Sequence, residues 1–418
     1  MIGFHGRPSR ALVLLTTGLL VTALAPAPAF AQATTSSTSA APGQGDFRRF
    51  VEALWPEARQ SGVSRATFDD AFRGVSPDPK IVALTKKQSE FVRPIWDYIN
   101  GAISNARLQR GREMAQRYAA QFEAAERNFG VPRSVILGVW GMETNYGSFT
   151  GNIYAVRALA TLAFVRYRGD FFRNELLTAL QILEQDHIGR DKMLGSWAGA
   201  MGQTQFMPSS FVRFAIDGDG DGRRDIWSSI PDAIASTANY LKEHGWTRGL
   251  PWGYEVALPD GFDFRNLRQT FGAWSGLGVQ RVDGRPLPGG GEATLFLPAG
   301  ASGPAFLVTA NYDVIKAYNA SDAYALAVGH LGDRVLGGPA LQGDWPTNER
   351  MLDRDQRVEV QRRLAALGHY QGETDGKHGS RTRDAVRRFQ LERGLVPDGY
   401  ANLALLERLR QARSVGLP

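Results

Sequence analysis

The chain contains no cysteine, and this absence limits how its fold can be stabilised. Disulfide bonds are excluded, as are thiolate nucleophiles and zinc sites built on cysteine. Stability must therefore come from a hydrophobic core. With 418 residues, 43% of them hydrophobic, the chain is long and apolar enough to bury such a core in two or three domains.

The N-terminal residues have the pattern of a secretory signal peptide. Arg7 and Arg10 give a positive start, residues 11–25 are apolar, and Ala29-Phe30-Ala31 is a typical cleavage sequence. The apolar run is shorter than the roughly 20 residues of a transmembrane helix. We therefore expect a signal peptide over residues 1–31, in preference to a short membrane anchor. The mature protein is expected to be exported, without a stable membrane anchor.

The charge of the chain suggests the kind of partner it binds. Its 48 basic residues exceed its 42 acidic residues, which gives a formal net charge of +6. A basic excess suits an anionic polymer such as nucleic acid or the cell wall. Export argues against nucleic acid.

Residues 32–45 are small and polar and predict a disordered linker, whereas residues 46–338 form a long segment of mixed character. Apolar residues recur at helical spacing in this segment, and prolines and glycines stand where helices can begin and end. Short β-forming runs between Gly and Pro indicate a small β region in residues 251–310. Helices are predicted over residues 47–55, 114–125, 131–143 and 231–245.

Glu143 is the residue most suited to acid chemistry. It lies in the sequence GMETNYG, where the predicted helix ends and Gly147 can terminate it. The negative end of the helix dipole and apolar neighbours such as Val139 and Trp140 both raise a carboxyl pKa. A carboxyl that stays protonated is what a general acid needs. On the local pattern alone, the alternative of a surface glutamate at a helix end is favoured.

Two other segments bear on Glu143. Residues 196–211 are rich in small residues, which allow a backbone to approach a bulky polymer closely. There, Gln205 can hydrogen-bond a sugar and Phe206 can stack on a sugar ring; a buried glycine-rich contact is the alternative. Further on, Tyr318 and Tyr324 can line a groove, since aromatic rings with polar tips suit sugars, or they can pack in the core.

Residues 46–335 resemble the lytic murein transglycosylase B family in its soluble form. The resemblance implies a lysozyme-like, mainly helical (α+β) fold. It also implies cleavage of the MurNAc–GlcNAc β-1,4 bond of peptidoglycan, with formation of 1,6-anhydro-MurNAc. We expect a monomer that acts on glycan strands. The matching motifs, in chain order, are Glu143-Thr144-Asn145-Tyr146-Gly147, Gly199-Ala200-Met201-Gly202, Gln205-Phe206-Met207-Pro208-Ser209-Ser210 and Asn311-Tyr312 through Tyr318-Asn319.

The chemistry of this family uses one carboxyl where most glycosidases use two. Glu143 would protonate the leaving oxygen, while the N-acetyl group of the substrate helps to stabilise positive charge at C1. The ionised Glu143 would then take the proton of the C6 hydroxyl, which attacks C1 at a high effective concentration. No water is consumed and no cofactor is required for the chemistry. A muramidase that hydrolyses the same bond and a non-catalytic wall-binding protein are the alternatives.

The resemblance also nominates neighbours of Glu143 that bind saccharide, and Arg168 as a partner for a carboxylate of the peptide stem. The saccharide-binding neighbours are Ser196, Gln205, Tyr240, Tyr318, Asn319 and Tyr324.

Residues 217–228 closely follow the pattern of an EF-hand loop. Alternating aspartates repel one another without a cation, so a structural calcium ion is the simple account; a turn that tolerates the charges is the alternative. Ser228 replaces the usual bidentate carboxylate at the last position, which should weaken the affinity. The candidate ligands are Asp217, Asp219, Asp221, the carbonyl of Arg223, and Asp225.

Residues 339–350 are rich in turn formers and predict a linker. The segment that follows has a distinctive spacing of residues, namely Val360-Gln361, Leu364, Leu367-Gly368, Tyr370, Gly372, Asp375-Gly376, Gly379, Thr382, Ala385-Val386, Phe389-Gln390, Gly394-Leu395 and Asp398-Gly399. In these residues, the segment 351–413 resembles a three-helix peptidoglycan-binding domain. Most of the matching residues are core or turn positions. Tethering such a domain to an enzyme raises the enzyme concentration at an insoluble substrate.

Overall fold

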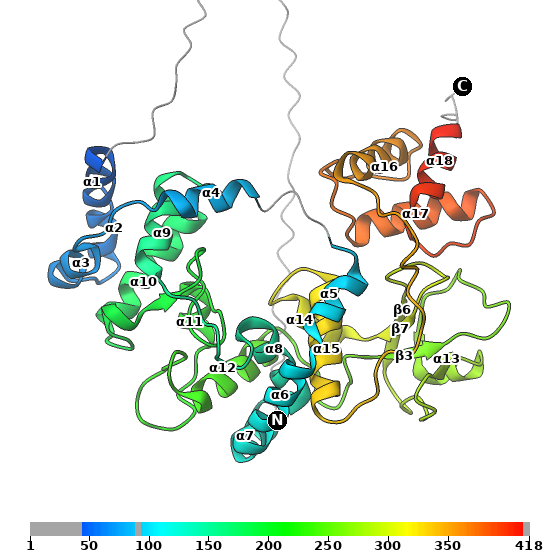
Figure 1. The fold of residues 1–418 in the computed structure, drawn as a ribbon, viewed down its shortest axis with the longest axis horizontal. Helices are drawn as coiled ribbons and strands as arrows, with labels where there is room; N and C mark the ends of the chain where they lie inside the picture. Colours follow the sequence, from blue (N-terminus) through cyan, green and yellow to red (C-terminus); the bar gives the residue numbers. More distant parts are fainter. Residues whose placement is uncertain (1–43, 88–92, 413–418) are drawn as a thin grey trace, which may run out of the picture. The chain divides into compact units, whose positions relative to one another are not determined.

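The structure, a computed structural model, describes residues 44–87 and 93–412 (Figure 1). The predicted signal peptide lies outside the described residues, as does the predicted linker up to residue 43. Gln44 and Gly45 were also predicted as linker but begin helix α1 (Gln44–Glu52). Helices dominate the described part and two small sheets accompany them, as predicted. None of the helices described is long and apolar enough to cross a membrane.

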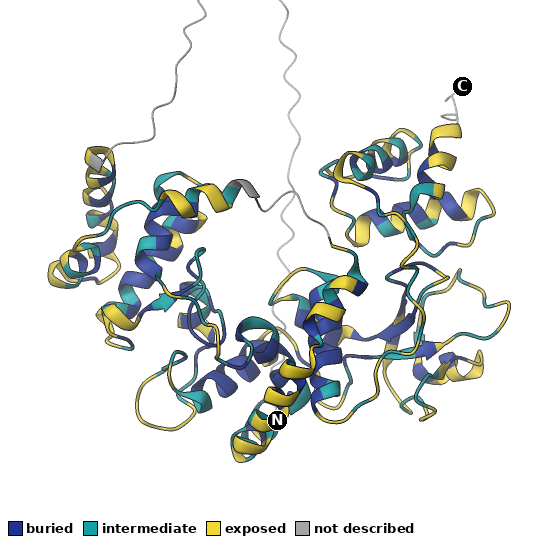
Figure 2. Cartoon of the chain, viewed as in Figure 1, coloured by how far each residue is buried: buried dark blue, intermediate teal, exposed yellow. Residues whose placement is uncertain are grey.

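The first helices pack with a central pair, α9 and α10, around one hydrophobic cluster. Helix α9 is buried on nearly all sides from Ala155 to Ala163, which makes it the centre of this group (Figure 2). Phe68 and Leu159, far apart in the chain, both lie in this cluster and are fully buried. The helices are α2 (Trp55–Gln60), α3 (Arg65–Phe72), α4 (Pro79–Lys87), α9 (Ala155–Phe164), α10 (Phe171–Glu184) and α11 (Pro208–Phe214).

A second helical group is built around α8 and α15. The predicted helices over 131–143 and 231–245 are present as α8 and α12. The predicted helix over 114–125 is instead broken at Tyr118, whose φ of −111° and ψ of 30° leave helical geometry. The helices of this group are α5 (Ile95–Ala102), α6 (Asn105–Arg117), α7 (Ala119–Phe129), α8 (Arg133–Thr144), α12 (Ile230–Glu243), α14 (Ala310–Lys316) and α15 (Asp322–Val335).

Helices α8 and α15 approach each other so closely that only glycine fits at the contact. A Cβ atom on Gly138 would lie 2.1 Å from the carbonyl oxygen of Val328. One on Gly332 would lie 1.9 Å from the carbonyl oxygen of Ser134. Real Cβ atoms do not approach oxygen this closely, so any larger residue would force the helices apart. The two glycines therefore fix the position of α15 along α8.

The predicted β region is present as an antiparallel sheet in the order β4-β6-β7-β3-β5. Helix α13 (Phe271–Gly276) covers it through the buried rings of Phe271 and Trp274, and the Trp274 indole donates a hydrogen bond to the carbonyl of Ala293 at 3.0 Å. The strands are β3 (Gly253–Ala257), β4 (Arg268–Thr270), β5 (Gln280–Arg281), β6 (Glu292–Phe296) and β7 (Ala305–Val308). A separate pair, β1 (Ile153–Tyr154) and β2 (Leu194–Gly195), is antiparallel.

The C-terminal residues form the predicted three helices, α16 (Arg354–Ala366), α17 (Ser380–Glu392) and α18 (Leu403–Gln411), around their own core. Two buried glutamines fix its turns. Gln361 accepts the N–H of Gly376 at 2.7 Å, and Gln390 accepts the N–H of Gly399 at 2.8 Å. These motif residues are structural, as expected.

Candidate active site

Glu143 lies in the last turn of α8, one residue before the helix ends at Thr144. The residue that ends the helix is Asn145, with a left-handed φ of 49° and ψ of 51°, and not Gly147 as predicted. Asn145 is held in place by a hydrogen bond from Arg107 at 3.3 Å and by another that its amide donates to Ser148 at 2.9 Å. The chain therefore turns sharply just after the carboxyl group.

The hydroxyl of Tyr324, at the start of α15, donates a hydrogen bond to Oε1 of Glu143 at 2.5 Å. Burial raises the pKa of Glu143 from 4.5 to about 7, and the bond from Tyr324 offsets this only in part. The raised pKa expected from the sequence is therefore present, and its main cause is removal of the carboxyl from water. Near neutral pH, Glu143 can both give and take a proton.

Among the described residues, four tyrosines lie near enough to Glu143 for its negative charge to add to burial in raising their pKa. Burial and this charge raise the pKa of Tyr240, on α12, to about 12. Burial and the charge of Glu143 also raise the pKa of Tyr98, Tyr318 and Tyr324. Sequence analysis nominated three of these residues and missed Tyr98, which lies on α5 outside any motif.

Tyr240 and Tyr318 also contact each other, with ring centroids 4.3 Å apart. The hydroxyl of Tyr240 donates to the carbonyl of Ala317 at 2.8 Å. Since Ala317 precedes Tyr318 in the chain, this bond fixes the backbone that presents Tyr318 to Glu143.

Gln203, which sequence analysis missed, anchors the loop that follows Glu143. Its Oε1 accepts the indole N–H of Trp140 at 3.0 Å, and its backbone carbonyl accepts the hydroxyl of Thr144 at 3.0 Å. A Cβ atom on Gly147 would lie 2.4 Å from Oε1 of Gln203. Gly147 is therefore needed for the loop after Glu143 to approach the segment 199–206 closely. This close approach brings two of the motifs together in space.

Ser196 and Gln205, two predicted saccharide ligands, are partly exposed and hold the loops around them. The Ser196 hydroxyl accepts the N–H groups of Ala198 at 3.3 Å and Ala200 at 3.1 Å. Gln205 has a φ of 51°, and its amide nitrogen donates to the carbonyls of Thr150 and Gly202, each at 3.0 Å. Its Oε1 has no partner among residues 44–87 and 93–412.

The remaining predicted ligands differ in their access to solvent. The Phe206 ring is only 2% exposed and lies in the core, 5.4 Å from the ring of Tyr240, so the expected stacking on a sugar was wrong. Asn319 is exposed. Arg168 is also exposed, with its guanidinium 5.4 Å above the ring of Tyr167, and no contact in the described residues joins it to Glu143.

The predicted calcium loop brings three of its aspartates together. Ligand oxygens of Asp217, Asp219 and Asp221 lie within 4.8 Å of one another, and this set of hard oxygen donors fits a calcium ion. Asp225 is instead turned toward its own loop, where it accepts the N–H groups of Trp227 and Ser228, each at 2.9 Å. Its carboxylate is therefore outside the cluster.

Two further residues frame this loop. Asp232, buried in the first turn of α12, accepts the N–H groups of Gly218 at 2.8 Å and Asp225 at 2.6 Å, which ties the loop to the helix. Sequence analysis missed this role, although Ser229 and Asp232 have the spacing of a helix cap. The side chain of Arg223 lies 4.0 Å from Asp186, and only its carbonyl was expected to bind the ion.

The chain is similar to known families and proteins. Residues 46–333 match the family described as Transglycosylase SLT domain, and residues 353–409 match the Putative peptidoglycan binding domain. The membrane-bound lytic murein transglycosylase B of Escherichia coli strain K12 is 35% identical over 240 residues, which are 56% of this chain. The match spans 65% of that relative, just under two thirds of its length.

Two solved structures are also similar. SltB3 from Pseudomonas aeruginosa, in complex with NAG-anhNAM-pentapeptide, is 47% identical with a TM-score of 0.82, over 87% of this chain and 99% of that chain. An Escherichia coli lytic transglycosylase in complex with calcium is 29% identical with a TM-score of 0.58, over 70% of this chain and 93% of that chain. The fold and the family expected from the sequence are thus confirmed, and the chain belongs to the lytic transglycosylase family, with a peptidoglycan-binding domain after the SLT domain.

Proposed function

We propose that this protein cleaves the MurNAc–GlcNAc β-1,4 bond of peptidoglycan and leaves 1,6-anhydro-MurNAc ends, with Glu143 as the catalytic residue. The observation that supports this most strongly is the buried carboxyl of Glu143, whose pKa is raised to about 7 and which accepts a hydrogen bond from Tyr324. The SltB3 structures in complex with NAG-anhNAM-pentapeptide and NAG-NAM-pentapeptide agree with this substrate class.

In the proposed reaction, Glu143 acts twice. As the protonated acid it gives its proton to the leaving glycosidic oxygen, and as the carboxylate it takes the proton of the C6 hydroxyl that attacks C1. A pKa near the working pH suits both roles. The hydroxyl of Tyr324 donates to the carboxylate, so it would hold Glu143 in one orientation between the two steps.

The surroundings of Glu143 favour this reaction over hydrolysis. A hydrolase needs a second carboxylate within about 5–9 Å of the acid. Two carboxylates at such a short distance perturb each other's pKa. In the described part of the chain, no other carboxylate acts on the pKa of Glu143; burial alone raises it. A sugar hydroxyl in place of activated water fits this single-carboxyl site.

Saccharide binding is proposed for the polar groups that remain available around Glu143. Oε1 of Gln205 is free to accept an N–H or O–H of the substrate, because the amide nitrogen is already bound to backbone. Ser196 and Asn319 would line the same site. Tyr240, Tyr318 and Tyr324 stay proposed neighbours of the saccharide, with the hydroxyls of Tyr240 and Tyr324 bound to Ala317 and Glu143. Arg168 stays a proposed partner for a peptide carboxylate.

A structural calcium ion is proposed for the loop over residues 217–228. The clustered oxygens of Asp217, Asp219 and Asp221 support it. Since the loop is tied to α12 through Asp232, and α12 carries Tyr240, the ion would stabilise a helix that lines the active site. The ion would have no part in the chemistry.

We further propose that the protein works in the periplasm after cleavage of its signal peptide, as a monomer, with the C-terminal domain holding it to glycan strands. The periplasmic location rests on the sequence pattern of residues 1–31 and on the peptidoglycan substrate, and the role of the C-terminal domain rests on its family.

The test is digestion of purified peptidoglycan by the wild type, by Glu143→Gln, and by Glu113→Gln as a matched control at an exposed position on α6. We expect Glu143→Gln to release no muropeptides while still binding to sacculi, and Glu113→Gln to behave as the wild type. Activity that survives in Glu143→Gln would contradict the assignment of the acid. If the wild type itself releases nothing, the protein only binds the wall.

A further inference from the structure

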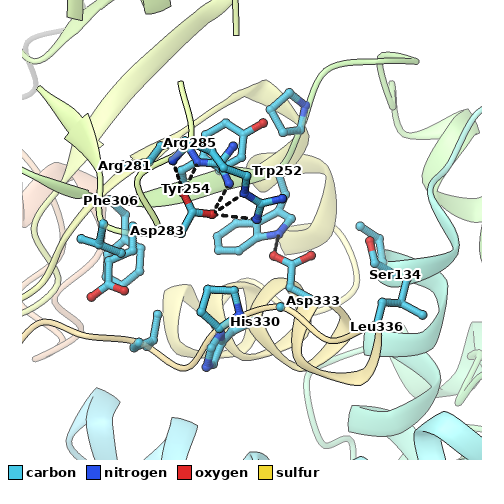
Figure 3. A pocket seen from close by; sticks show the side chains of 18 of the residues that line it. Ser134, Trp252, Tyr254, Arg281, Asp283, Arg285, Phe306, His330, Asp333 and Leu336 are labelled. Atoms are coloured by element: carbon cyan, nitrogen blue, oxygen red, sulfur yellow. Dashed lines mark hydrogen bonds and ion pairs between the residues drawn. The ribbon is translucent and has the colours of Figure 1, made fainter. Parts of the chain in front are cut away.

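A cavity of about 800 Å³ lies where the helical group around α8 and α15 meets the β region. Its walls include Ser134 at the start of α8, Asp333 near the end of α15, and Trp252 just before β3 (Figure 3). Ser134 and Glu143 are nine residues apart on α8, or about 14 Å along the helix. The cavity is therefore at the far end of the helix pair from the catalytic carboxyl.

One wall of this cavity carries an excess of positive charge. Arg281 and Arg285 share a single carboxylate, that of Asp283: Nε of Arg281 bonds it at 2.9 Å and Nη2 of Arg285 at 2.7 Å. Although burial raises the pKa of Asp283, the two arginines hold it at about 2, so this carboxylate stays ionised. Asp283 is the only carboxylate that forms an ion pair with either arginine among the described residues. The Arg281 guanidinium lies 4.0 Å above the ring of Tyr254, whereas the Arg285 side chain, held to Asp283 through Nε and Nη2, is 64% exposed.

The opposite wall carries a single carboxylate. Oδ2 of Asp333 accepts the indole N–H of Trp252 at 3.0 Å, and its other oxygen has no hydrogen-bond partner within residues 44–87 and 93–412. Burial raises the pKa of Asp333 to about 6, so it is mostly ionised at neutral pH. Glu255, another carboxylate that lines the cavity, accepts the N–H groups of Gln342 and Gly343.

His330 completes this end of the cavity and carries no charge at neutral pH, because burial and the charge of Arg334 lower its pKa to about 4. Asp333 is therefore a negative charge that forms no ion pair with a described residue, although the charges of Arg281 and Arg285 act on it and lower its pKa. Figure 3 shows the Trp252 indole between Asp333 on one side and Asp283 with its two arginines on the other.

We propose that this cavity binds a short peptide with a free amino group and a free carboxyl group. The ammonium group would bind Asp333, the carboxylate would bind Arg285, and the intervening carbons would pack on Trp252. A simple anion would be repelled by Asp333 and a simple cation by the arginine pair, whereas a zwitterion satisfies both walls.

The probe is the dipeptide alanyl-alanine, titrated into the full chain and followed by saturation-transfer difference NMR. The Glu143→Gln variant is used throughout, so that binding is measured independently of the proposed reaction. N-acetyl-alanyl-alanine, which lacks the ammonium group, and alanyl-alanine amide, which lacks the carboxylate, are the matched ligands. We expect the free dipeptide to bind at least tenfold more tightly than either capped form, because each loses a hydrogen bond between charged groups.

Two variants locate the site. Asp333→Asn keeps an acceptor for the Trp252 indole but removes the charge, and Arg285→Gln changes an exposed side chain; each should weaken binding of the free dipeptide at least tenfold. Arg265→Gln, at an exposed arginine outside the cavity, should leave it unchanged. Equal binding of capped and free dipeptides, no binding at all, or binding unchanged in both variants overturns the proposal, as does a preference for N-acetylglucosamine disaccharide.

Discussion

Replacing Tyr324 with phenylalanine should raise the pKa of Glu143 above its value of about 7. The Tyr324 hydroxyl donates to Oε1 at 2.5 Å and so stabilises the ionised carboxylate more than the neutral acid. A hydrogen bond to a charged group contributes about 1.5–3 kcal/mol, and one pKa unit corresponds to about 1.4 kcal/mol. Loss of the hydroxyl should therefore raise the pKa by about one to two units.

The rate should report this change in the pKa of Glu143, because the first step of the proposed reaction needs the protonated acid. The activity of Tyr324→Phe should persist to a pH about one to two units higher than in the wild type. The assay is the initial rate of muropeptide release from sacculi as a function of pH. Tyr98→Phe is the control, since Tyr98 faces Glu143 but no hydrogen bond joins the two in the described structure. An alkaline limb that stays in place, or moves to lower pH, in Tyr324→Phe refutes the reasoning.

Three further predictions concern stability. Glu143→Gln should stabilise the fold by up to about 3 kcal/mol above pH 7. Folding raises the pKa of the Glu143 carboxyl from 4.5 to about 7, so keeping this carboxyl ionised in the folded protein costs free energy that glutamine does not. This gain should vanish below about pH 4.5, where both states bind the proton; denaturant unfolding at both pH values checks it, and an equal effect at the two would contradict it. A chelator should lower the melting temperature of the wild type but not of Asp219→Asn, and an unchanged wild type would argue against a bound ion. Asp322, in the first turn of α15, forms an ion pair with Arg383 of the C-terminal domain at 2.7 Å. A double-mutant cycle of Asp322→Asn and Arg383→Gln should therefore give a coupling free energy of about 1 kcal/mol in unfolding. A coupling of zero would show that the pair contributes nothing to stability.

Much of the fold could be predicted because periodicity and proline and glycine positions are local signals. Helices α8 and α12 and the β region between residues 251 and 310 were found in this way. The break at Tyr118 was missed, since apolar spacing continues through it while the backbone does not. The end of α8 was misplaced by two residues, because Asn145 adopts the left-handed conformation that glycine usually provides.

The site was less accessible to sequence reasoning, because it is assembled by tertiary packing. The sequence pattern around a phenylalanine beside a polar motif is the same whether its ring contacts a sugar or packs in the core. Only the 2% exposure of Phe206 distinguishes these two positions. Tyr98 comes from a helix that carries no motif, and Asp232 acts through a loop that precedes it. The partnership of Glu143 with Tyr324 depends on how α15 lies along α8, which Gly138 and Gly332 determine.

The central claim, that Glu143 uses a sugar hydroxyl in place of water, is tested most directly by digesting peptidoglycan in water enriched in oxygen-18. Mass spectrometry of the released muropeptides distinguishes the two reactions. We predict 1,6-anhydro-MurNAc ends that carry no heavy oxygen, with no product from Glu143→Gln. Reducing MurNAc ends labelled with oxygen-18, without anhydro ends, would show that the enzyme is a hydrolase and would contradict the account.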